Sequence, residues 1–226
     1  MVLEIWLYMV HNMDLIASRT LEHISLVAVA IGLAILTGVP IGIAITQNKR
    51  VASVVLYIGA IIMTIPSIAL FGLMIPVLSK FGQGIGYVPA VIAVLLYSQL
   101  PIIRNTYTAI TNVDPALREA ARGMGMTSLQ RLRKVEIPLA IPVIMAGIRS
   151  AVVLNIGIMA IAAYIGAGGL GVFISQGISQ TDPRQLVTGA VAVSVLAIVA
   201  DYALLWLQHR LEPAGLKSAQ ALGGAP

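Results

Sequence analysis

The glycines between positions 166 and 171 have a spacing known from nucleotide chemistry. Gly166, Gly168 and Gly171 form G-x-G-x-x-G, which binds the pyrophosphate of a dinucleotide when it joins a strand to a helix in a βαβ unit. Here the glycines follow an apolar stretch long enough to span a membrane, and no strand precedes them. We therefore interpret the segment as a re-entrant turn in which Gly168 and Gly169 cover or gate the end of a pathway.

The remaining residue types exclude most catalytic chemistry. The chain has no cysteine, and its histidines, His11, His23 and His209, are not spaced as metal ligands. It also lacks a G-x-x-x-x-G-K-[ST] phosphate loop, so we expect this chain to bind no ATP, metal or other cofactor. The sequence predicts neither an enzyme nor a metalloprotein.

Two charged residues, Arg149 and Asp201, lie inside long apolar stretches, where an unpaired charge is costly. Counted along a helix, both lie at a similar depth from the same membrane surface. We predict that they form an ion pair with each other or with a neighbouring subunit. A structural role is favoured over contact with a substrate.

Prolines and polar residues interrupt the same stretches. Four prolines lie within the apolar stretches, among them Pro66 and Pro101. Each proline removes a backbone N–H. Such a break persists at membrane depth only where protein or a water-filled cavity satisfies the freed backbone groups. Together the prolines indicate a pathway. Tyr97, Gln99 and Asn155 either line this pathway or form hydrogen bonds between helices.

The elements that must position these residues are membrane helices. Hydrophobic residues make up 58% of the 226 positions and charged residues only 10%, whereas about a quarter of a soluble domain is charged. With about twenty apolar residues for each span, the sequence predicts an all-α polytopic membrane protein with five transmembrane helices. The expected spans are 24–46, 51–78, 87–110, 137–164 and 186–208.

The distribution of Lys and Arg predicts the orientation. They are concentrated after the first span, in residues 114–138 and in the tail, which places these parts in the cytoplasm and the N-terminus outside. The basic residues therefore serve as topology signals, and no nucleic-acid partner is expected. Residues 1–19, with Trp6 and Tyr8, are predicted to lie at the membrane interface, ahead of a transmembrane domain at 20–210 and a cytoplasmic tail at 211–226.

Residues 114–138 form a polar island between two apolar stretches. Asp114 and the proline after it predict the start of a helix over 115–124, and Gly125 predicts its end. Thr127 and Gln130 form a capping box that starts a second short helix. A ten-residue helix is marginal alone in water, so this one needs a partner surface.

The spacing within the island carries a resemblance. Glu119-Ala120-Ala121, three residues, Gly125, nine residues and then V-E-I-P resembles the EAA-x3-G-x9-I-x-L-P signature of the membrane subunits of binding-protein-dependent ABC importers. Further stretches are similar to the branch that imports the osmoprotectants glycine betaine, carnitine and choline. These are M-T-I-P-S at 63–67, L-P-I-I-R-N-T-Y at 100–107, G-M-G-M at 123–126 and I-G-A-G-G-L-G at 165–171.

The resemblance implies a type I ABC importer permease (MetI-like) fold in a bacterial plasma (inner) membrane. It implies two cytoplasmic ATPase subunits, which bind the ATP and Mg, a second permease copy or paralogue, and an extracytoplasmic solute-binding protein or domain.

In this picture the helix over 115–124 is the coupling helix. Glu119 faces the ATPase, Ala120 and Ala121 permit close approach, and Gly125 allows the turn back to the membrane. Arg118 and Arg122 add charge contacts at the rim.

Other interpretations remain open. Permeases of the same fold import methionine and other small solutes, so the exact solute is not decided by this chain. An ion-coupled secondary transporter would also be polytopic, but we find no internal repeat of the kind that such transporters carry. A membrane scaffold would explain the spans without giving the island a special role.

Overall fold

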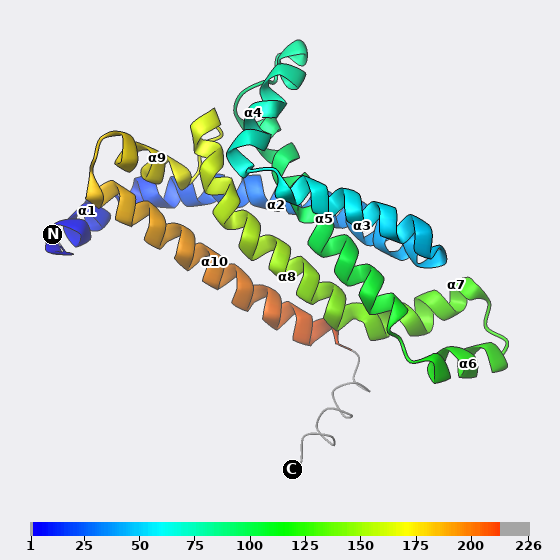
Figure 1. The fold of residues 1–226 in the computed structure, drawn as a ribbon. Coiled ribbons are helices and arrows are strands. Elements are labelled where there is room, and N and C mark those ends of the chain that lie inside the picture. Colours follow the sequence, from blue (N-terminus) through cyan, green and yellow to red (C-terminus); the bar gives the residue numbers. More distant parts are fainter. Residues whose placement is uncertain (1, 213–226) are drawn as a thin grey trace.

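The computed structural model describes residues 2–212, and the regular elements of this part of the chain are all helical (Figure 1). Four of the described helices are long and apolar enough to cross a membrane. They are α2 (Met13–Ala44), α5 (Tyr87–Thr111), α8 (Ile137–Ile161) and α10 (Pro183–Leu211). The all-α membrane fold predicted from hydropathy is therefore confirmed.

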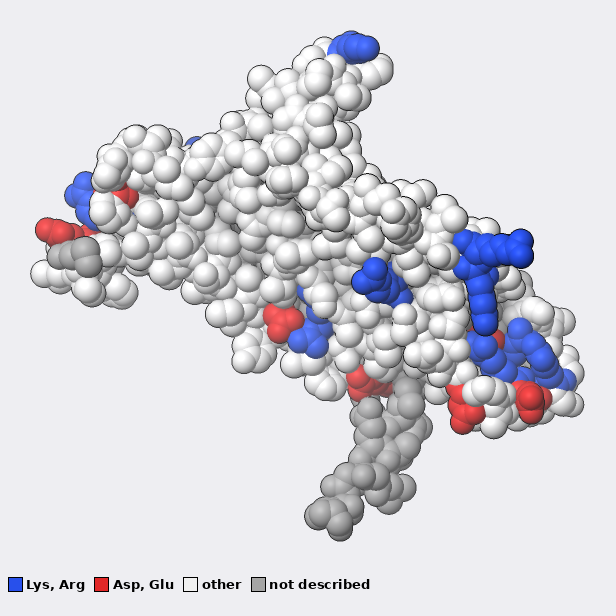
Figure 2. All heavy atoms as spheres, in the orientation of Figure 1, with Lys and Arg blue, Asp and Glu red and all other residues white. Residues whose placement is uncertain are grey.

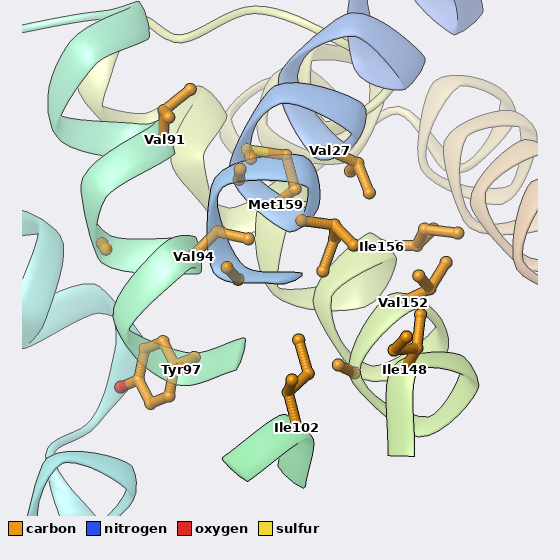
Figure 3. Close-up of a cluster of buried hydrophobic side chains, with 14 of the residues drawn as sticks. Val27, Val91, Val94, Tyr97, Ile102, Ile148, Val152, Ile156 and Met159 are labelled. Carbon is orange, nitrogen blue, oxygen red and sulfur yellow. The ribbon is translucent and has the colours of Figure 1, made fainter. Parts of the chain in front are cut away.

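The core lies where α2, α5 and α8 pack against one another. Small residues bring α2 and α5 close together: a Cβ on Gly38 would lie 2.9 Å from Ile102 Cγ2, and one on Gly42 would lie 2.6 Å from Thr106 Cβ. Such close backbone approach is how membrane helices associate, because burial from lipid supplies little hydrophobic driving force. Figure 3 shows side chains of the three helices filling the space between them, among them Val27, Val94, Ile148, Ile156 and Met159.

The predicted second span, 51–78, is a bent pair of helices. It consists of α3 (Lys49–Thr64) and α4 (Ser67–Leu78), extended by the 3-10 turn η2 (Ser79–Phe81), with a bend of 99° between them. The bend lies at Ile65 and Pro66, because proline has no N–H to donate and favours extended backbone in the residue before it. Ile65 accordingly has φ −70° and ψ 126°. The predicted total of five spans is therefore reached only if this bent pair is counted as one span.

The N-terminal residues also differ in detail from the prediction. They form α1 (Val2–His11), which packs against α10, and α2 begins at Met13 instead of near residue 24. The side-chain amide of Asn12 donates to the Tyr8 carbonyl oxygen at 2.8 Å, which ends α1 just before α2 starts. Placement of 1–19 at a membrane interface stays a prediction, and residues 213–226 of the expected tail lie outside the described residues.

One end of the bundle, here called the glycine end, carries the G-x-G-x-x-G turn. Beyond α8 come the 3-10 turn η4 (Ala162–Ile165), the glycines and then α9 (Gly171–Ser179), which leads into α10. Gly166, Gly168 and Gly169 have φ between +71° and +82°, where side chains with a Cβ are strained. Glycine is therefore required by the backbone of this turn.

The opposite end, here called the island end, carries α6 (Pro115–Gly123), α7 (Ser128–Arg131) and the π-helical segment η3 (Leu132–Glu136). The capping box predicted at Thr127 and Gln130 is present, with bonds of 2.9 and 3.3 Å. Figure 2 shows Lys and Arg gathered over this end of the molecule. The element between α2 and α3 at the same end is the 3-10 turn η1 (Ile45–Gln47).

Candidate functional site

Helix α6 presents part of the E-A-A pattern to the outside. Asp114 begins the helix by accepting a hydrogen bond from the backbone N–H of Ala116 at 2.8 Å. Glu119, Ala120 and Arg122 are exposed. A nine-residue helix is too short to be stable by itself, so α6 depends on the contacts of its inner face and leaves its outer face for a partner.

Apolar side chains lie among the charges of this outer surface. Met124 is 70% exposed, Leu129 is 56% exposed and Leu117 is 45% exposed. Exposed apolar groups gathered in a polar segment are typical of a protein contact surface. These three residues were not among the predicted contact residues, although large apolar side chains inside a polar stretch were the available signal.

Gly125 supplies the positive φ expected at the end of α6. Its φ is +75°, and its N–H donates to the Arg122 carbonyl oxygen at 2.9 Å. A Cβ at this position would meet nothing within 4 Å. Glycine is therefore favoured here because of the backbone conformation. The space around the position would admit a larger side chain.

Ala121 is buried in this chain. It is 1% exposed, and its carbonyl oxygen accepts the N–H of Met126 at 3.1 Å. Consecutive residues of a helix point in different directions, so Ala120 faces out while Ala121 faces its own chain. Ala121 packs within this chain, and its expected role in close approach to an ATPase stays a prediction.

Arg118 makes contacts within the chain, and its expected place at the rim of an ATPase contact stays a prediction. Its Nε lies 3.4 Å from Oε1 of Glu136, the same oxygen that Arg131 Nε approaches at 2.8 Å. Arg118 also donates to the carbonyl oxygen of Ile110 at the end of α5. With Glu136 only 6% exposed, this island ion cluster ties α6 to α5 and to the segment that leads into α8. Sequence reasoning missed Glu136, although an acidic residue in the apolar V-E-I-P ending was the available signal.

Arg149 and Asp201 are brought together from α8 and α10. The guanidinium donates from Nε to Oδ1 and from Nη2 to Oδ2, both at 3.0 Å, which is a two-pronged ion pair. The third nitrogen, Nη1, lies 3.4 Å from the side-chain oxygen of Gln208. Of the two predicted alternatives, the ion pair within one chain is therefore the one that the structure contains.

The polar pathway candidates near the bend make hydrogen bonds within this chain. The Tyr97 hydroxyl donates to the Ile65 carbonyl oxygen directly before Pro66, so it holds the place where α3 and α4 diverge. Gln99 donates to Thr37 Oγ1 at 2.9 Å. These are bonds between helices, one of the two roles expected for Tyr97 and Gln99.

Asn155 and Pro101 lie deeper in the bundle. The Asn155 amide is buried and donates to Ser98 Oγ at 2.9 Å, which links α8 to α5. Pro101 lies inside α5, and its carbonyl oxygen accepts the Asn105 amide at 2.8 Å. In this conformation Asn155 fastens two helices and does not face an open path.

The glycine turn closes against α2. The N–H of Gly169 donates to Glu22 Oε2 at 2.9 Å, and Glu22 also pairs with Arg19 at 2.7 Å. A Cβ on Gly168 would lie 2.2 Å from Glu22 Oε1, and one on Gly169 would lie 2.9 Å from His23 Nδ1. The sequence analysis did not connect Glu22 or His23 with the turn, because their contact depends on how α2 packs.

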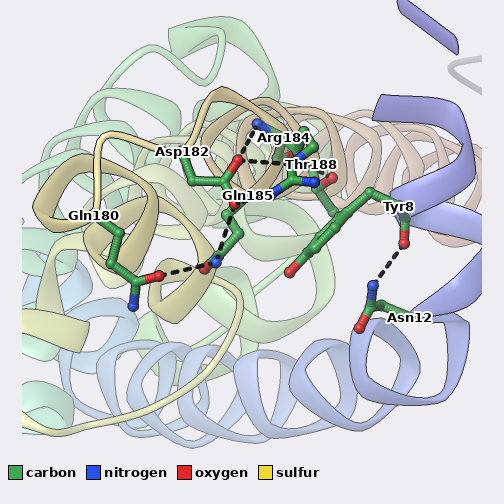
Figure 4. A network of polar contacts seen from close by, with 7 residues as sticks. All are labelled: Tyr8, Asn12, Gln180, Asp182, Arg184, Gln185 and Thr188. Atoms are coloured by element: carbon green, nitrogen blue, oxygen red, sulfur yellow. Dashed lines mark hydrogen bonds and ion pairs between the residues drawn. The ribbon is translucent and has the colours of Figure 1, made fainter. Parts of the chain in front are cut away.

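Beside this turn, the start of α10 carries a polar network (Figure 4). Asp182 accepts from the backbone N–H and from Nε of Arg184, both at 3.0 Å. The hydrogen bond from the Arg184 side chain lowers the pKa of the Asp182 carboxyl below its ordinary value. The Arg184 guanidinium also lies 5.9 Å from the ring centre of Tyr8, which connects α1 to α10.

Within the described residues, no three His, Cys, Asp or Glu side chains are grouped as metal ligands would be. The functional features of this part of the chain are therefore surfaces and helix junctions. Comparison with known proteins gives these features a context. Residues 24–214 match the family described as binding-protein-dependent transport system inner membrane component. The chain belongs to this family.

Its relatives are permease subunits. The osmoprotectant import permease protein OsmW of Salmonella typhimurium is 57% identical over 93% of this chain and 98% of its own length. The choline transport system permease protein OpuBB of Bacillus subtilis is 44% identical over 90% of this chain and 92% of its own. The Bacillus subtilis glycine betaine/carnitine/choline permease OpuCB is 43% identical over 88% and 89%.

A solved structure supports the fold. A chain of the MetNI methionine ABC transporter in an inward-facing conformation has a TM-score of 0.80 and 24% identity, covering 89% of this chain and 98% of that one. The fold is therefore that of a type I ABC importer permease, as expected. The protein is a transport component of the inner membrane, and ATP hydrolysis lies on a separate subunit.

Proposed function

We propose that this chain is the membrane-spanning permease subunit of an ATP-driven importer for osmoprotectants such as glycine betaine, choline or carnitine. The outer surface of α6 carries the proposal. Glu119, Ala120 and Arg122 are exposed on it, and the apolar side chains of Met124, just after α6, and of Leu129 on α7 are exposed as well. The names of the relatives support the solute class.

In this proposal α6 docks on a cytoplasmic ATPase, and two ATPase subunits serve two permease subunits. The second permease is another copy of this chain or a paralogue. ATP and Mg bind to the ATPases, and a solute-binding protein or domain delivers the solute from outside. The island end and the C-terminus face the cytoplasm, while the N-terminus lies outside, in keeping with the basic residues of the island.

Docking is tested by purifying the tagged chain from its own membranes and identifying the proteins that accompany it. We expect an ATPase to accompany the wild type and to be lost with Glu119→Lys plus Gly125→Trp. The first change reverses the exposed charge, and the second strains the turn at φ +75°. An ATPase retained by the double variant, or absent from the wild type in mild detergent, contradicts the docking role of α6.

Gly82 offers a matched control for the bulky change. It has φ +69°, and a Cβ there would also meet nothing within 4 Å, but it lies after η2, away from the island. Gly82→Trp should keep the ATPase, since it places a similar strain outside the docking surface. Loss of the ATPase from Gly82→Trp would show that a tryptophan at such a turn acts through general misfolding.

The solute class is tested by uptake into cells that contain the full assembly. Radiolabelled glycine betaine, choline and carnitine are compared with methionine. Uptake of the quaternary amines that requires the ATPase supports the proposal. Uptake of methionine alone favours a permease of the same fold for another solute, and uptake independent of the ATPase favours an ion-coupled transporter.

A further inference from the structure

A groove between α8 and α10 surrounds the Arg149–Asp201 pair. Its volume is about 800 Å³, within the range of roughly 300–1,000 Å³ typical of small-molecule sites. Apolar side chains form most of its walls, and both charges reach its surface. Its lining includes Arg149, Ser150, Val153, Ile198, Asp201 and Tyr202.

Both charges of the pair are accessible in this chain. The Arg149 side chain is 22% exposed and the Asp201 side chain is 37% exposed. Figure 2 shows acidic and basic atoms in contact over α8 and α10, reaching the surface of the molecule. The pair is therefore open on one side of the groove.

The groove lies well inside the membrane. Along the helices, Arg149 is about 18 Å from Ile137 at the start of α8, and Asp201 is about 15 Å from Leu211 at the end of α10. Accessible charges at such depth face the inside of a bundle or a water-filled cavity, because contact with lipid tails is too costly. This side of α8 and α10 therefore faces water or a polar ligand.

The groups in the groove match a small zwitterion with a methylated ammonium. The Arg149 guanidinium can bind a carboxylate, and its Nη1 has only the weak 3.4 Å contact with Gln208. The Asp201 carboxylate and the Tyr202 ring, on a side chain 68% exposed, can bind the cation. Val153 and Ile198 offer apolar surface to its methyl groups.

We propose that this groove holds the transported solute briefly on its way through the membrane, with Arg149 on its carboxylate and Asp201 and Tyr202 on its quaternary ammonium. The inference rests on the proposed function, and it adds a solute contact in the permease itself. Glycine betaine, with both charges, binds more tightly than choline, which lacks the carboxylate.

The natural absence of cysteine makes the test direct. Ser150→Cys places one thiol in the groove, and Ser179→Cys places one on the exposed corner after α9 as a control. The assembly, with its ATPase and without the binding protein, is placed in nanodiscs. Each thiol is labelled with a trimethylammonium methanethiosulfonate in the presence or absence of glycine betaine or choline.

We expect the Ser150→Cys thiol to be labelled, and glycine betaine to slow its labelling. By mass action, the rate falls about fivefold at a solute concentration about four times Kd. Choline protects less at the same concentration, and the Ser179→Cys thiol is not protected. Tyr202→Leu, an exposed change that the fold tolerates, weakens protection by both solutes. Arg149→Gln plus Asp201→Asn, which keeps the groove neutral, abolishes the preference for glycine betaine.

A Ser150→Cys thiol that is never labelled overturns the inference, because the groove is then covered by lipid or by a second copy. A thiol that is labelled equally fast with and without solute also overturns it. Uptake is measured with the same Ser150→Cys chain: normal uptake without protection rejects only the groove, whereas absence of quaternary-amine uptake in wild type rejects the proposed function.

Discussion

Arg149 and Asp201 come from positions 52 residues apart in the sequence and meet at membrane depth. Loss of either side chain leaves the other charge without its partner, so Arg149→Ala and Asp201→Ala should each destabilise the chain. Because the two losses overlap, the double variant should cost less than their sum by about 1–3 kcal/mol. The free energy of unfolding is measured for the wild type, the two single variants and the double variant in micelles with an increasing SDS fraction. Additive losses would show that the contact is not energetically coupled.

A second prediction at this scale concerns Gly171, where α9 begins. A Cβ there would lie 1.9 Å from the carbonyl oxygen of Ala160, which belongs to the backbone and has little freedom to move. Gly171→Ala should therefore lower the free energy of unfolding by about 1–3 kcal/mol. The same unfolding measurement gives the value.

Gly157 is the matched control for that change. It lies in α8, and a Cβ there would meet nothing within 4 Å, so Gly157→Ala should be neutral or should stabilise the helix by up to about 1 kcal/mol. Equal losses at both positions would mean that the close approach at Gly171 is not the cause.

Residue types alone could predict some of these contacts. A lone charge in an apolar stretch needs an opposite charge, and the sequence offered Asp201 for Arg149. The burial of Ala121 and the contacts of Glu136 could not be predicted in the same way, because both depend on how α6 folds back on the island. Glu22 meets Gly169 across 147 positions, which no local pattern indicates.

At the scale of elements, the island ion cluster connects α6 with α8. Glu136 lies between Arg118 of α6 and Arg131 of α7, directly before α8 begins. Glu136→Gln removes the negative charge that pairs with both arginines. Movement of α6 should therefore be coupled less tightly to the membrane helices. We expect uptake to fall about tenfold, equivalent to about 1.4 kcal/mol of coupling, while the ATPase still accompanies the purified chain.

Arg133, exposed on the same π-helical segment, supplies the control for this variant. Arg133→Gln also removes one charge from the island but leaves the cluster intact, and uptake should stay close to the wild-type rate. If Glu136→Gln takes up solute normally, or if it loses the ATPase, the cluster does not act as the connection between the two helices.

Elements with local causes were predicted well from the sequence. The ends of α6 and the start of α7 depend on Asp114, Gly125, Thr127 and Gln130, each acting within a few residues. The 99° bend at Pro66 was predicted only as an interruption, because a proline fixes local backbone while its neighbours decide the direction of the chain. The hydrogen bond from the Tyr97 hydroxyl to the Ile65 carbonyl oxygen is a tertiary contact of this kind.

The whole molecule has an orientation that can be measured with the same cysteine-free background. Ser128→Cys lies at the island end and Ser179→Cys at the glycine end, and both residues are exposed. A membrane-impermeant maleimide should label Ser179→Cys in intact cells whose outer membrane has been made permeable. It should label Ser128→Cys only in inverted vesicles, since the basic island stays in the cytoplasm. The reverse pattern would invert the proposed topology.

Hydropathy predicted the class of the whole molecule because twenty apolar residues leave few alternatives to a membrane helix. The first long helix begins before the predicted span, since α2 includes polar residues such as Asp14 and Arg19 ahead of its apolar part. Helix formation and membrane insertion are separate properties, and hydropathy reports only the second.

The length of α2 has a mechanical consequence. Its 32 residues extend about 48 Å, whereas the hydrocarbon part of a bilayer is about 30 Å thick. Such a helix tilts or projects from the lipid, and its angle responds to bilayer thickness. Because Glu22 on α2 holds the N–H of Gly169, a change of tilt pulls directly on the glycine turn. We therefore expect the acyl-chain length of the surrounding lipid to alter the contact between α2 and the glycine turn.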